Sequence, residues 1–96
     1  MNFKTIGISE LWNMRARADT YIIDLRDKSD YQNFHIEGAQ NHPYEEMSGW
    51  VNSLPKDKKI VLYCEHGSLS MMASRKLARM GYEVYTLVGG ISSLNG

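Results

Sequence analysis

The single cysteine of this chain, Cys64, is the residue best placed to do chemistry. It follows an apolar run at 59–63 that predicts a buried strand, and it begins a turn into a polar segment at 65–68 that predicts a loop. The apolar spacing that follows predicts a helix over about 69–80, ended by Gly81. Unpaired N–H groups at the start of that helix would point back at the sulfur and favour its thiolate form. The pattern therefore predicts a nucleophilic thiol.

The lone cysteine also limits this chemistry. One cysteine excludes a disulfide within the chain and a Cys-x-x-Cys redox pair, so any second thiol must come from another molecule. The ordinary alternative for a lone cysteine is an inert, small core residue. We favour the reactive thiol because the strand end, the polar loop and the following helix agree independently.

The elements that would position Cys64 alternate between strand and helix patterns, which predicts an α/β fold. We expect strands at 3–6, 21–25, 59–63 and 83–88, a turn and brief extended piece at 35–39, and helices at about 9–19, 29–34, 43–54 and 69–80. Ser9 and Ser29 are the expected N-caps of the first two helices. Asp24 and Cys64 both fall at carboxyl ends of strands, where open parallel sheets bind ligands, so the two residues are expected to share a site.

Size and charge narrow the classes of function. The chain has 96 residues, 43% of them hydrophobic, which fits one compact domain over residues 1–96. Equal numbers of basic and acidic residues, 11 of each, argue against a nucleic-acid or membrane-surface partner. No signal-type apolar core and no run of transmembrane length is visible, so we expect a cytoplasmic protein without a membrane partner.

A series of short segments forms a second pattern, in this order: Asp24-Leu25-Arg26, Asp30-Tyr31, His35-Ile36-Glu37-Gly38-Ala39, Cys64-Glu65-His66-Gly67-Ser68-Leu69-Ser70, Gly81-Tyr82 and Val88-Gly89-Gly90. Nearly the whole chain thus resembles the single-domain rhodaneses, sulfurtransferases that carry sulfur as a cysteine persulfide. The resemblance implies a three-layer fold with a mainly parallel central sheet of about five short strands and helices on both faces.

The resemblance also implies roles for particular residues. Cys64 would be the catalytic nucleophile, and Asp24 and Arg26 would be supporting residues that tie loops together. The backbone amides of the following loop would cradle the persulfide and bind an anionic substrate; these residues are Glu65, His66, Gly67, Ser68, Leu69 and Ser70. Sulfur would pass from thiosulfate, a small sulfur-containing anion, or from a persulfide donor to cyanide, a thiol or a protein. Neither an organic cofactor nor a metal is implied.

The roles of individual loop residues remain open between two interpretations. His66 is either a solvated loop residue or a donor that steers an anionic substrate, and Ser68 and Ser70 are first of all expected helix caps. Glu65 beside an anion site is expected to face solvent or a protein partner. An ion pair between Arg26 and Asp30 is plausible, whereas a zinc site that includes His35 and His42 matches no standard spacing.

Two loop positions, 69 and 70, distinguish the competing functions. Many rhodaneses have arginine where this chain has Leu69, which leaves the sulfur donor open and keeps a non-catalytic or protein-fed binding module as the alternative. Phosphatases and arsenate reductases of this architecture require arginine where this chain has Ser70. Without that guanidinium to hold the equatorial oxygens of phosphate, phosphoryl chemistry is disfavoured.

Overall fold

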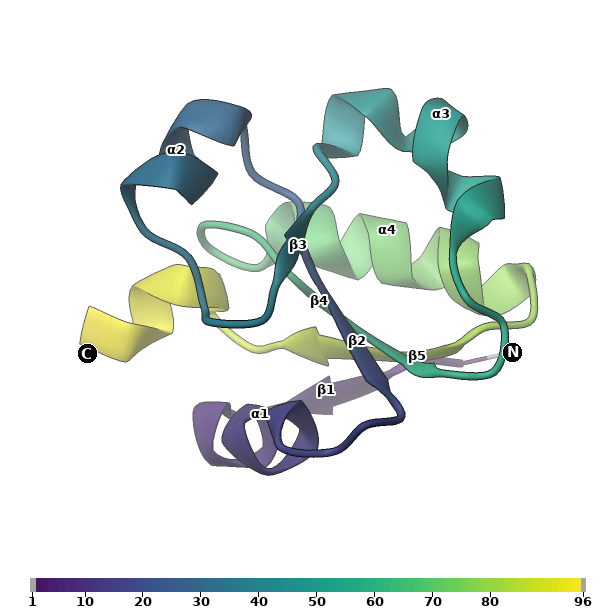
Figure 1. Cartoon of the computed structure of the whole chain (residues 1–96), viewed down its shortest axis with the longest axis horizontal. Helices are drawn as coiled ribbons and strands as arrows, with labels where there is room; N and C mark the ends of the chain where they lie inside the picture. Colours follow the sequence, from purple (N-terminus) through teal and green to yellow (C-terminus); the bar gives the residue numbers. More distant parts are fainter. Residues whose placement is uncertain (1, 96) are drawn as a thin grey trace.

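A five-stranded sheet forms the centre of the computed structural model, which describes residues 2–95 (Figure 1). The strands are β1 (Lys4–Ile6), β2 (Thr20–Asp24), β3 (Gln40–Asn41), β4 (Lys59–Tyr63) and β5 (Glu83–Leu87). The helices are α1 (Ile8–Arg15), α2 (Lys28–Asn33), α3 (Met47–Trp50) and α4 (Ser68–Arg79), and three 3-10 helices are η1 (Tyr44–Glu46), η2 (Val51–Ser53) and η3 (Gly90–Asn95). The strand order is β1-β5-β4-β2-β3, and every neighbouring pair is parallel. The predicted α/β fold with a parallel sheet is confirmed.

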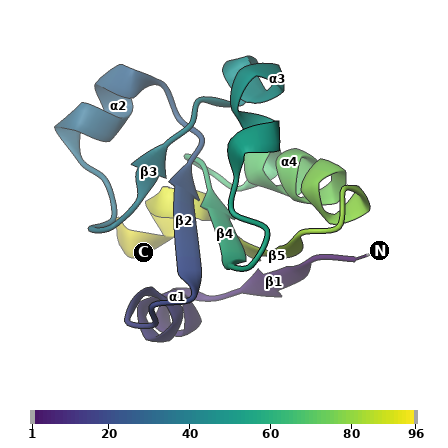
Figure 2. The same cartoon turned by 45° about the vertical axis from the view of Figure 1, so that its right-hand side comes forward.

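The central strand β4 supplies both apolar layers of the protein. Ile60 and Leu62 belong to the core cluster beneath α3 and α4, whereas Val61 and Tyr63 belong to the cluster that packs against α1 and η3. This alternation follows from the period of two residues in a strand. Figures 1 and 2 show the same layers, with α3 and α4 on one side of the sheet, α1 on the other and α2 beside β3. The helices therefore cover both faces, as predicted.

Helix α4 packs on the sheet through small side chains. Its buried residues are Ser70, Ala73, Ser74, Leu77 and Ala78, which recur at the helical spacing of three and four residues. Small residues let the helix approach the strands closely. Met72 does not belong to this buried stripe and is 52% exposed, because it lies one residue before Ala73 and is rotated toward solvent.

The starts of the first two helices differ from prediction. The N-cap of α1 is Gly7, whose N–H donates to Glu10 Oε1 over 3.2 Å, and the N-cap of α2 is Asp27. Ser9 and Ser29 therefore lie within the helices rather than at their caps. Helix α1 also ends at Arg15, earlier than predicted, where a turn toward β2 begins.

The predicted helix over 43–54 is not continuous. The chain forms η1, α3 and η2 in succession, and Gly49 lies within α3, where glycine weakens a helix. A side-chain bond from Trp50 Nε1 to the Pro43 carbonyl, 2.9 Å long, holds this compact segment together. The segment nevertheless packs its apolar side toward the sheet, since Met47, Val51 and Leu54 are all buried.

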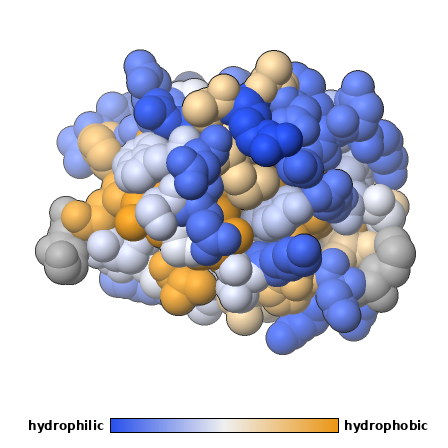
Figure 3. Space-filling view, turned by 90° about the horizontal axis from the view of Figure 1, so that it is seen from below, coloured by the Kyte–Doolittle hydropathy of each residue, from blue (hydrophilic) through white to orange (hydrophobic). Residues whose placement is uncertain are grey.

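Figure 3 shows the molecule from below the view of Figure 1, with hydrophilic residues over the upper and right-hand parts of this face. Hydrophobic residues gather toward the left of that view, the side on which η3 lies in Figure 1. Among residues 2–95, no helix combines the length and the apolar character needed to span a membrane.

Candidate active site

Cys64 follows the last residue of β4 and lies beneath the start of α4. It is 2% exposed and belongs to the apolar cluster on the α4 side of the sheet. Two backbone N–H groups point at its sulfur: that of Gly67 lies 3.1 Å from Sγ, and that of Ser70 lies 3.4 Å from it. Such donors, at the positive end of a helix, stabilise negative charge on sulfur. This arrangement suits a thiolate or a persulfide anion.

The loop turns sharply at Gly67, which is the N-cap of α4. Its φ of 107° lies in the left-handed region, and an added Cβ would come within 3.3 Å of the Gly89 nitrogen. The expected caps, Ser68 and Ser70, do not cap the helix through their side chains. The Ser70 hydroxyl instead donates to the Gly67 carbonyl over 3.1 Å, from a position within the first turn.

The segment that leads into η3 holds the loop from the other side. The N–H of Ile91 donates to the Cys64 carbonyl over 2.8 Å, and the N–H of Ser92 donates to the Glu65 carbonyl over 3.0 Å. Gly90 permits this approach, because an added Cβ would lie 2.5 Å from both of those carbonyl oxygens. Gly90 is part of the resemblance to the rhodaneses, but the sequence analysis assigned it no structural role. The pair of glycines directly after a buried strand was the sequence signal for a close backbone approach.

Asp24 and Arg26 pair with each other rather than with the sulfur. The Asp24 side chain is fully buried, and the Arg26 guanidinium donates to it, with Nη2 2.9 Å from Oδ2. Burial of the guanidinium acts to lower its pKa, but the hydrogen bonds and charge of Asp24 outweigh burial and raise the pKa of Arg26 above its ordinary value. The expected partner of Arg26 was Asp30; the structure places Asp24 and Glu65 there instead.

The sheet register explains why Asp24 and Cys64 do not face one another. Asp24 pairs with Tyr63 across β2 and β4, and residues paired in register point to the same face. Tyr63 packs on the α1 side, whereas Cys64, one residue later, packs on the α4 side. The link between Asp24 and the loop runs through Arg26, whose Nη1 lies 3.4 Å from Glu65 Oε1.

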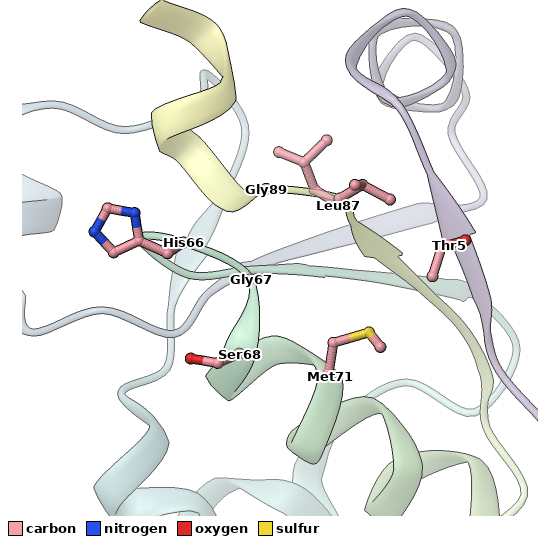
Figure 4. A pocket seen from close by; sticks show the side chains of 8 residues that line it. Thr5, His66, Gly67, Ser68, Met71, Leu87 and Gly89 are labelled. Carbon is pink, nitrogen blue, oxygen red and sulfur yellow. The ribbon is translucent and has the colours of Figure 1, made fainter. Parts of the chain in front are cut away.

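The rim of the loop is exposed, and a cavity of about 360 Å³ lies beside it (Figure 4). Its lining consists of Thr5, His66, Gly67, Ser68, Met71, Leu87, Val88 and Gly89. The His66 ring points away from Met71 and Thr5 in Figure 4, and its Nδ1 lies 3.2 Å from Ser92 Oγ. Leu69 is partly buried and packs against the core cluster that contains Cys64. Across residues 2–95, no three His, Cys, Asp or Glu side chains cluster in a way that could hold a metal ion.

One buried residue near the loop was missed by sequence reasoning. Thr86 of β5 is 1% exposed, and its hydroxyl donates to Ser70 Oγ over 2.8 Å. A polar side chain at a buried position of an apolar strand, two residues after the buried Val84, was the signal that could have found it.

The comparison with protein families agrees with this architecture. A family model described as "Rhodanese-like domain" matches residues 8–96. The chain belongs to this family. The sequence-based recognition of a rhodanese is therefore confirmed, with the fold that it implied.

Similar proteins include several named as sulfurtransferases. This rhodanese-like chain is 32% identical over 93 residues to the "Thiosulfate sulfurtransferase GlpE" of Shewanella oneidensis, a match that covers 96% of the chain and 92% of that protein. It is 35% identical over 75 residues to the "tRNA sulfurtransferase" of Desulfurococcus amylolyticus, covering 78% of the chain but 15% of that longer protein. The crystal structure of a rhodanese-related protein from Thermoplasma volcanium superposes with a TM-score of 0.87 and 25% identity, covering 95% of this chain and 89% of that one. The relatives therefore support membership of the sulfurtransferase family.

Proposed function

We propose that this protein transfers sulfane sulfur from thiosulfate or a persulfide donor to a thiophilic acceptor through a persulfide on Cys64. The observation that carries the proposal is the pair of N–H groups, from Gly67 and Ser70, that point at Cys64 Sγ. The similarity to a thiosulfate sulfurtransferase along nearly the whole chain supports the same chemistry. Cys64 is the proposed catalytic residue, and the loop over 65–70 is the proposed anion cradle.

In the first half-reaction the Cys64 thiolate attacks the outer sulfur of thiosulfate. A new S–S bond forms to Cys64 as the S–S bond of thiosulfate breaks, and sulfite leaves with the bonding electron pair. The negative charge moves from the thiolate to the terminal sulfur of the persulfide. Backbone N–H groups at the start of α4 suit this change because they are fixed donors that need no proton transfer.

In the second half-reaction an acceptor attacks the terminal sulfur. With cyanide, a carbon–sulfur bond forms, the persulfide S–S bond breaks, and the thiolate of Cys64 is regenerated as thiocyanate leaves. A thiol or a protein thiolate would accept the sulfur in the same way. Each step exchanges one bond to sulfur for another, so no oxidant, metal or organic cofactor enters the proposed cycle.

The electrostatics of the loop rim bear on which acceptors can approach. Glu65 places a carboxylate beside the anion cradle, but the Arg26 guanidinium engages it, and the side chain is half-exposed. Arg26 therefore offsets the charge of Glu65 and holds it at the rim. We infer that Glu65 faces the approaching acceptor, which gives a protein acceptor a polar contact to recognise.

Intact-protein mass spectrometry after thiosulfate treatment tests the proposal. The wild type should gain the mass of one sulfur atom, and cyanide should remove that gain and release thiocyanate. Cys64→Ser should gain nothing. If the wild type gains no sulfur from thiosulfate, a persulfide-bearing protein or low-molecular-weight persulfide is tried as donor, and failure with every donor would contradict the proposal.

A protein-fed carrier is the second candidate, and Leu69 is the observation that favours it. Leu69 is a partly buried apolar side chain. Many rhodaneses have an arginine at this position, which would help to hold thiosulfate. Sulfur loading from a persulfide donor but not from thiosulfate would select this candidate.

A further inference from the structure

A chain of buried hydrogen bonds connects the sheet to the loop around Cys64. The Thr86 hydroxyl donates to Ser70 Oγ over 2.8 Å, and the Ser70 hydroxyl in turn donates to the Gly67 carbonyl over 3.1 Å. Gly67 and Ser70 are the residues whose N–H groups point at Cys64 Sγ. The chain of hydrogen bonds therefore ends on Gly67 and Ser70, the two residues whose N–H groups form the cradle.

We propose that Thr86 is a positioning residue for the Cys64 cradle, which aims the Gly67 and Ser70 N–H groups at the sulfur through this chain of hydrogen bonds. Thr86 does not touch the sulfur in this arrangement and acts through Ser70. The inference deepens the proposed function and rests on it.

The place of Thr86 in the sheet makes it a fixed reference for the loop. Thr86 pairs with Leu62 across β5 and β4, two interior strands of the sheet, and both residues lie on the α4 side. Cys64 lies two residues beyond Leu62 and on the same side. Thr86 is thus anchored beside the strand that carries the sulfur.

The hydroxyl of Thr86 matters because of how Ser70 is satisfied. A serine hydroxyl has one proton to donate, and Ser70 gives it to the Gly67 carbonyl. The Thr86 hydroxyl donates a hydrogen bond to Ser70 Oγ, and this bond orients the Ser70 hydroxyl toward Gly67. Both hydroxyls are fully buried, so water cannot readily replace a lost partner.

The test compares the thiolate content of Cys64 across pH in three variants. Thiolate is followed by its ultraviolet absorbance, with the Cys64→Ser spectrum subtracted; the chain has one cysteine, so the signal reports Cys64 alone. Thr86→Val keeps the shape of the side chain and loses the hydroxyl. Thr86→Ser keeps the hydroxyl and loses a methyl group. Thr20→Val is the matched control, because Thr20 Oγ1 is buried and has no hydrogen-bond partner among the described residues.

In Thr86→Val we expect the midpoint of the thiolate titration to rise by about one pH unit, which is about a tenfold fall in the ratio of thiolate to thiol at any fixed pH. Thr86→Ser and Thr20→Val should keep the wild-type midpoint. Denaturant unfolding of each variant shows whether it is folded, and a general packing defect would affect Thr86→Ser as well.

Two results would overturn the inference: an unchanged midpoint in folded Thr86→Val, or an equal rise in Thr86→Ser. Because the titration measures the thiol before any sulfur donor is added, it remains decisive if the wild type fails to form a persulfide. That failure would contradict the proposed function alone.

Discussion

At the scale of single residues, the cradle around Cys64 offers backbone N–H groups, whereas position 69 offers only an apolar side chain. Leu69 precedes Ser70 in the first turn of α4 and packs against the cluster that contains Cys64. Thiosulfate carries two negative charges, so a cation at this position would attract the donor to the loop. The affinity for thiosulfate is therefore the property most open to change by one substitution.

Leu69→Arg should lower the KM for thiosulfate about threefold to tenfold, the effect of roughly 1 kcal/mol from a partly exposed charge pair. Steady-state thiocyanate formation measures it. Leu69→Gln is the matched control, because it also replaces the apolar side chain but adds no charge, and its KM should not fall. An equal or higher KM in Leu69→Arg would contradict this account of the loop.

At the scale of elements, the loop after β4 is held between α4 and η3. Gly90 lets the backbone of η3 approach so closely that Ile91 reaches the Cys64 carbonyl. Its φ of 64° adds a second requirement for glycine, since side chains rarely adopt this conformation. Contact with η3, as well as the helix start, therefore fixes the loop.

Gly90→Ala should lower the free energy of unfolding more than Gly81→Ala does. Both glycines have positive φ, but an added Cβ at Gly81 meets nothing within 4 Å. Gly81→Ala thus reports backbone strain alone, about 1–3 kcal/mol. Gly90→Ala adds displacement of two hydrogen-bonded carbonyls and should cost about 1–3 kcal/mol more. Denaturant unfolding measures both variants, and equal losses would show that the close approach has no energetic role.

The elements also show what the sequence could predict. Strands β2, β4 and β5 were predictable because buried strands leave apolar runs, and the end of β4 placed Cys64 correctly before the loop. The caps at Gly7 and Asp27 were missed because nearby serines are equally good local candidates. Local patterns could not decide between them.

The contacts that complete the candidate site were beyond local patterns for a different reason. Thr86 reaches Ser70 across 16 residues of sequence, and Gly90 meets the Cys64 carbonyl from a segment that follows β5. Such contacts depend on the order of strands in the sheet and on their register. Sequence periodicity gives the face on which a side chain lies but not which strand lies beside it.

At the scale of the whole molecule, His42 joins parts of the chain that only the folded state brings together. Its Nε2 lies 2.9 Å from the hydroxyl of Tyr21 in β2, and its ring stacks on Trp50 of α3 with centroids 5.1 Å apart. Burial lowers the pKa of His42 below its ordinary value and raises that of Tyr21. The Tyr21 hydroxyl is therefore protonated at neutral pH, and neutral Nε2 can accept its proton. The folded state thus favours an uncharged His42.

This preference links global stability to pH. The pKa of His42 is lower in the folded state than the value of about 6.5 expected in the unfolded chain, so below that pH the unfolded chain binds more protons. The contribution of His42 is fully present above about pH 6.5 and is lost as the pH falls toward the folded-state value, with a slope of at most about 1.4 kcal/mol per pH unit.

Denaturant unfolding between pH 7.5 and about pH 5 should show a steeper loss of the free energy of unfolding in the wild type than in His42→Gln, which keeps polar atoms but cannot titrate. Groups that titrate elsewhere affect both proteins alike and cancel in the difference. Parallel curves would mean that the lowered pKa of His42 does not contribute to folding, since a single proton bound preferentially by the unfolded chain must change the slope.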